Sequence, residues 1–167
     1  MGKLFKLVSS MLHRAALAVV VLLASVMLLS IGWQVVMRFA FNRPPSWTEE
    51  LALLCFSWIV LLMLAVGVRE AFHARIDLLD KLLPTAWVPW LERGLLLITA
   101  AFGAYLAKGG ATYVIETASA TSAAMAYPIY ALHVAAPVCG VLIACFALEL
   151  LWLGSPNADS PAKATAP

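Results

Sequence analysis

Long apolar runs, separated by short polar or proline-containing stretches, organise this chain from one end to the other. A helix needs about 20 apolar residues to cross ~30 Å of hydrocarbon. Four runs approach or exceed this length, and most of them are bounded by charged residues. They cover residues 15–37, 51–68, 94–115 and 123–148. The pattern predicts an all-α integral membrane protein with four transmembrane helices.

The composition agrees with a membrane location. Hydrophobic residues make up 63% of the chain and charged residues 12%, against about 25% charged residues in a typical soluble domain. The formal net charge of +2, with no basic stripe, gives no reason to expect a nucleic-acid partner. The three cysteines form no CxxC pair and no cluster with histidine, so we expect neither a disulfide framework nor a metal site.

We expect one membrane domain over residues 1–153 and a disordered tail over residues 154–167, GSPNADSPAKATAP. The first run follows a basic stretch and could be mistaken for a signal peptide. A signal peptide's apolar region is about 7–15 residues long, and this run is longer, so we interpret it as a retained helix. Lys108 interrupts the third run, and we expect its side chain to reach the interface.

The distribution of basic residues predicts the orientation. Eight of the eleven Lys and Arg residues fall on one side of a four-span arrangement: Lys3, Lys6, Arg14, Arg69, Arg75, Lys81, Arg93 and Lys163. Arg38, Arg43 and Lys108 fall on the other side. By the positive-inside rule, both termini are expected in the cytoplasm.

The connection between the first and second runs, RFAFNRPPSWTEE, breaks at two consecutive prolines. Ser46 can cap the following helix, with Glu49 at the third helical position completing a capping box. Glu50 is expected to face a polar partner, which is Arg38, Arg43 or another subunit, because an unpaired charge near the bilayer is costly. No nucleophile accompanies the two carboxylates, so we expect no catalytic site.

The connection between the second and third runs, VREAFHARIDLLDKLLP, alternates apolar and charged residues at helical spacing. It predicts a short amphipathic helix on the membrane surface, with Arg75, Ile76, Asp77 and Leu79 among its residues, that ends at a proline.

Small residues repeat at helical spacing in the last two runs. They are Ala100, Gly103, Ala104 and Ala107 in the third run, and Ala136, Gly140 and Ala144 in the fourth. Such faces let helix backbones approach closely.

Two other classes of membrane protein fit four spans. A haem- or quinone-binding anchor of a redox complex needs histidines at mid-depth on two helices. Only His133 falls within a run, whereas His13 and His73 lie at or beyond the ends. A stand-alone small exporter is disfavoured because the sequence shows no charge pair embedded within the runs.

The stretch from residue 38 to residue 84 resembles the small membrane subunit, DctQ-like, of tripartite ATP-independent periplasmic (TRAP) transporters. The resemblance rests on the aromatic-basic end of the first run and four ordered features: SWTEEL at 46–51, an aromatic pair at Phe56 and Trp58, VREAFHARIDLL at 68–79, and an LP stop. The four spans extend it up to residue 153.

The resemblance implies a scaffold subunit in the inner membrane of a bacterium. It implies a large membrane subunit that contains the substrate and sodium sites, and a soluble periplasmic binding protein that delivers an organic acid, such as a C4-dicarboxylate or sialic acid. It implies no substrate site and no cofactor in this chain. The other expected contact is membrane lipid. No broken, glycine-rich half-helix of the kind that forms transport sites is evident in the sequence.

Overall fold

The computed structural model describes residues 2–82 and 88–153, and their regular structure is helical. In chain order the helices are α1 (Gly2–Phe41), α2 (Trp47–Leu82), α3 (Val88–Glu116), α4 (Tyr130–His133) and α5 (Ala135–Leu153). The predicted tail, residues 154–167, lies outside the described residues.

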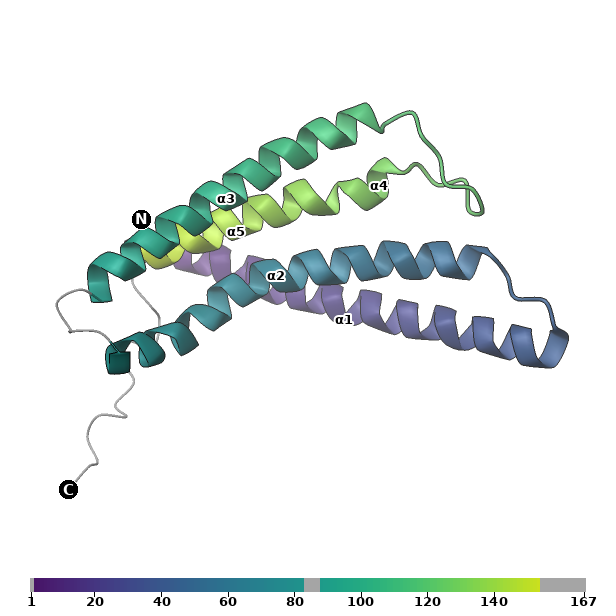
Figure 1. Cartoon of the computed structure of the whole chain (residues 1–167), viewed down its shortest axis with the longest axis horizontal. Coiled ribbons are helices and arrows are strands. Elements are labelled where there is room, and N and C mark those ends of the chain that lie inside the picture. The colour runs from purple at the N-terminus through teal and green to yellow at the C-terminus, as the bar shows by residue number, and fades with distance from the viewer. Residues whose placement is uncertain (1, 83–87, 154–167) are drawn as a thin grey trace, which may run out of the picture.

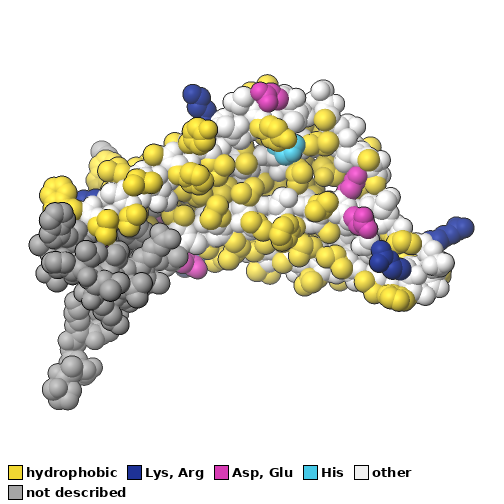
Figure 2. All heavy atoms as spheres, viewed as in Figure 1, with side chains coloured by type: hydrophobic (Ala, Val, Ile, Leu, Met, Phe, Trp, Pro, Cys, Tyr) yellow, Lys and Arg dark blue, Asp and Glu magenta, His cyan; other side chains and the backbone are white. Residues whose placement is uncertain are grey.

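Within the described residues, four helical segments are long and apolar enough to cross a membrane: Leu7–Phe41, Trp47–Glu70, Trp90–Glu116 and Tyr130–Trp152. This confirms the predicted all-α class with four spanning helices. Figure 2 shows hydrophobic side chains over the middle of the visible face, with charged side chains toward its ends and edges. That distribution suits a protein whose middle lies in hydrocarbon.

The second helix is longer than the second apolar run. The segment that carries Arg75, Ile76, Asp77 and Leu79 is helical, but it continues α2 without a break instead of forming a separate element. No proline falls between the start of α2 and residue 83, so nothing interrupts the backbone hydrogen bonds of the helix before that point. The side chains of these four residues lie outside the part of the chain whose side chains the structure describes.

The fourth span begins later than residue 123. Residues 117–129 form a loop, in which Thr121 and Pro128 make an isolated bridge and Ala126 has a φ of 55°. A helix cannot continue through that left-handed residue. Pro137 has no amide hydrogen to give to the carbonyl of residue 133, which explains the short interruption between α4 and α5.

The long helices pack as two antiparallel pairs. α1 lies along α2, α3 lies along α5, and contacts between α2 and α5 join the two pairs. Figure 1 shows that the pairs converge near the N-terminus of α1 and diverge toward the opposite end. The buried core at the junction consists of Ala16, Leu62, Ala65, Val66, Cys139, Leu142, Ile143 and Phe146.

Glycines allow the closest approach between α3 and α5. A Cβ atom added at Gly103 would lie 2.8 Å from the Gly140 carbonyl oxygen, and one added at Gly110 would lie 2.7 Å from a carbon of Pro137. The predicted small-residue faces therefore meet at the row that contains Gly103 and Gly110. Ala104, which the sequence pattern also placed among the small residues of this helix, is exposed.

Candidate functional site

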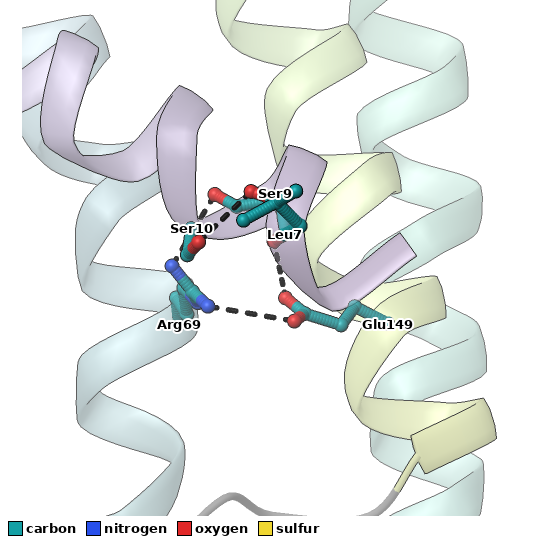
Figure 3. A network of polar contacts seen from close by, with 5 residues as sticks. All are labelled: Leu7, Ser9, Ser10, Arg69 and Glu149. Carbon is teal, nitrogen blue, oxygen red and sulfur yellow. Dashed lines mark hydrogen bonds and ion pairs between the residues drawn. The ribbon is translucent and has the colours of Figure 1, made fainter. Parts of the chain in front are cut away.

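A buried polar network joins three helices at the end where the helix pairs converge (Figure 3). The Arg69 guanidinium of α2 donates from Nη2 to Glu149 Oε1 of α5 at 3.4 Å and from Nη1 to the Ser9 carbonyl of α1 at 3.3 Å. The Ser9 hydroxyl donates to the other carboxylate oxygen of Glu149. The side chains of Arg69 and Glu149 are 16% and 4% exposed. Their opposite charges therefore compensate each other away from water.

Aromatic and charged neighbours surround this network. The Arg69 guanidinium carbon lies 5.7 Å from the centroid of the Phe146 ring, a distance at which a cation is attracted to the ring face. His13 Nε2 lies 3.0 Å from Glu70 Oε1, and the His13 ring meets Phe146 edge-on with centroids 6.4 Å apart. The network holds α1, α2 and α5 together at this end.

The pattern of apolar and polar residues does not predict this network. Glu149 directly follows the predicted fourth run, and Arg69 directly follows the second, so both counted as boundary residues. The predicted runs themselves contain no charge pair, but both helices continue past the ends of these runs, and Arg69 pairs with Glu149 just beyond them. A signal was available: Glu149 is flanked by apolar residues on both sides, and an acidic residue in that setting needs a partner.

At the opposite end, Glu50 fixes the loop between α3 and α4. Its two carboxylate oxygens accept hydrogen bonds from the amides of Ala124 and Met125, at 2.8 and 2.9 Å. Burial raises the pKa of the Tyr127 phenol, and the Glu50 charge raises it further. The partners predicted for Glu50 were Arg38, Arg43 or another subunit; within the described chain its carboxylate bonds to loop amides instead.

The other residues predicted in the connection between the first and second runs lie at the same end. Ser46 directly precedes α2 and Glu49 is the third residue of that helix, as a capping box requires. However, the Glu49 carboxylate accepts a hydrogen bond from the Gln34 side chain of α1, 2.7 Å away. Arg38 and Arg43 are exposed, and neither forms an ion pair within the described chain.

Further polar contacts tie the helix pairs together between these ends. The Trp58 indole donates to the carbonyl of Ala131 at 2.9 Å, and the Cys139 thiol donates to the carbonyl of Leu61 at 2.9 Å. The first contact joins α2 to α4, and the second joins α2 to α5. Trp58 and Cys139 therefore act in packing.

The two histidines whose side chains the structure describes, His13 and His133, do not converge on one site. His133 Nδ1 lies 2.9 Å from Thr117 Oγ1, and its ring packs on Tyr113 with centroids 4.5 Å apart. His13 contacts Glu70 instead. Among the described residues, no group of three or more His, Cys, Asp or Glu side chains could hold a metal ion. The side chain of His73 lies outside the described part.

Comparison with known proteins adds to this geometry. A family model described as "Tripartite ATP-independent periplasmic transporters, DctQ component" matches residues 27–156. The sialic acid TRAP transporter small permease protein SiaQ of Vibrio cholerae is 28% identical over 79 residues, which are 47% of this chain and 46% of that protein. The sialic acid TRAP transporter permease protein SiaT of Haemophilus influenzae is 41% identical over 51 residues, which are 30% of this chain and 8% of that protein. The chain therefore matches less than half the length of each relative.

Proposed function

Because this chain belongs to the DctQ component family of the tripartite ATP-independent periplasmic transporters, we propose that it is a scaffold subunit. It is a multi-pass membrane protein, and in this proposal it braces a large membrane subunit while that subunit carries substrate across the bilayer. Uptake depends on a periplasmic binding protein. Both termini of the chain lie in the cytoplasm, and the membrane is the bacterial inner membrane.

One observation carries the proposal. The buried carboxylate of Glu149 and the partly buried guanidinium of Arg69 bond to each other and to Ser9. A transport site for an organic anion needs polar groups that turn toward a pathway and are exposed alternately. Here the same groups hold helices together, which suits a rigid support.

The outer surface supports the same function. Large apolar side chains are exposed along the helices, among them Leu29 at 75% and Ile98 at 68%. Within a membrane such faces pack against lipid or other transmembrane helices through van der Waals contact. The chain therefore offers broad surfaces to a larger membrane protein and to the surrounding lipid.

Substrate and coupling ion belong to the other components in this proposal. The large subunit contains the substrate and sodium sites, and this chain holds no cofactor of its own. The substrate is an organic acid such as a C4-dicarboxylate or sialic acid. The names of both relatives, which mention sialic acid, favour that acid as the first substrate to test.

Purification tests the proposal. The tagged full chain, expressed at native level and extracted in mild detergent, is expected to bring down one much larger membrane protein in equal amount. A matched sample expressed without the tag controls for nonspecific recovery. Recovery of a haem protein, with a Soret band that elutes together with this chain in gel filtration, would contradict the scaffold role and support a haem-binding membrane anchor of a redox complex. Recovery of this chain alone would contradict the proposal.

A further inference from the structure

The face of α3 that points away from α5 carries a row of polar side chains. Tyr105, Lys108, Thr112 and Glu116 recur at intervals of three or four residues and are all exposed, Tyr105 at 76%. Gly110, two residues beyond Lys108, faces Pro137 of α5. Two residues correspond to about 200° around a helix, so this polar row lies on the opposite side.

The row falls inside a helix that is long and apolar enough to span the membrane. The candidate span runs from Trp90 to Glu116, and Lys108 lies eight residues before its end. Those eight residues correspond to about 12 Å along the axis at ~1.5 Å per residue. This span also has the lowest mean hydropathy of the four. Lys108 makes no ion pair within the described chain.

A lipid-facing helix does not need such a row. On α1, the exposed side chains of Leu22, Leu28 and Leu29 are apolar, and residues 15–37 contain no charge. Hydrocarbon suits that face well. The Thr112 hydroxyl donates to the Lys108 carbonyl within α3, at 3.2 Å. The Lys108 ammonium group is costly in lipid at this depth and calls for a partner with a complementary charge.

We propose that the row of Tyr105, Lys108, Thr112 and Glu116 docks against a transmembrane helix of the large subunit, and that this helix presents a carboxylate to Lys108. Charge complementarity defines the occupant: a protein helix can hold a carboxylate at this depth, whereas lipid tails cannot. The small side chains of Ala101 and Ala104 beside the row are exposed and leave room for a close backbone approach. This inference rests on the proposed function.

Co-purification of charge variants with the large subunit tests the docking face. Lys108→Glu is expected to reduce the recovered large subunit at least tenfold and Lys108→Met several-fold, while Lys108→Arg retains wild-type recovery. Arg93→Met is the matched control, because Arg93 is an exposed basic residue near the start of the same helix. Wild-type recovery with both Lys108→Glu and Lys108→Met would overturn the docking face.

Photo-crosslinking keeps the test valid if a charge variant fails to insert. A benzophenone amino acid at Tyr105 of the otherwise native chain is expected to form an adduct with the large subunit in intact membranes. Adducts with lipid only would show that this face of α3 borders lipid, and would overturn the proposal. If the wild-type chain recovers no large subunit, the proposed function itself is refuted. If the wild-type chain and the Lys108 variants recover it equally, only the proposed docking face is refuted.

Discussion

Replacing Arg69 with methionine removes the positive charge that faces Glu149 in the buried network of Figure 3. The Glu149 side chain is 4% exposed and that of Arg69 is 16% exposed, so the remaining carboxylate keeps almost no access to water. Removing one partner of a buried ion pair costs about 3–5 kcal/mol of the free energy of unfolding. We expect about 3 kcal/mol here, because the partial exposure of Arg69 places the pair at the low end of that range.

A double-mutant cycle identifies the cause of that loss. Glu149→Gln removes the charge but keeps oxygen for the Ser9 hydroxyl, so the variant that combines both changes leaves no buried charge unpaired. We expect it to lose less than the sum of the single variants, with a coupling free energy of about 1–2 kcal/mol. Unfolding in mixed micelles, followed by circular dichroism as dodecyl sulfate replaces the mild detergent, measures each value.

The control for this cycle is Arg93→Met, which changes an exposed basic residue. Its effect should stay within about 0.5 kcal/mol of wild type. The reasoning would be refuted if Arg69→Met were as mild as this control, or if the two single changes added without coupling. Either result would mean that the network does not hold α2 and α5 together.

Three further predictions follow from the loop, the helix contact and the topology. Glu50→Ala should speed hydrogen exchange at the two loop amides that donate to this carboxylate. Glu50→Gln should speed it less, because the amide oxygen of glutamine still accepts one of the two bonds. Unchanged exchange in both variants would show that the contact does not form. Gly140→Ala should destabilise the chain by about 1–3 kcal/mol, because the added carbon would lie 2.6 Å from a carbonyl oxygen of α3. Gly109→Ala is the control and should cause no loss of stability, because an added carbon there would meet nothing within 4 Å. Thermal unfolding measures both variants. In a cysteine-free chain, a cysteine at Asn42 should react with an impermeant thiol reagent added outside cells and one at Asp80 should not, because basic residues favour the cytoplasm; reversed labelling would invert the topology.

The sequence predicts the helices better than their polar contacts. Hydropathy indicates four spans because each run is costly to expose to water, and the structure confirms the number. The small residues around Gly103 and Gly140 also predict which faces approach closely, since helical spacing puts them in one row. The predicted start of the fourth span, at residue 123, is too early, because apolar composition carries no information about the left-handed backbone at Ala126.

Partners distant in the sequence could not be predicted in the same way. Arg69 and Glu149 are 80 positions apart, and only the packing of α2 on α5 brings them together. The partners of Glu50 are backbone amides, which every residue except proline carries, so no side-chain pattern distinguishes them. Polar residues near span ends therefore indicate that partners exist, and the packing of the helices decides which they are.

Reconstituted uptake tests the scaffold role most directly. Proteoliposomes with an inward sodium gradient receive this chain, the large subunit or both, and labelled sialic acid bound to the binding protein is added outside. The account predicts accumulation only when both membrane subunits are present, and none with this chain alone, because its buried charges bond to each other. Accumulation by this chain alone, or full activity of the large subunit without it, would contradict the account.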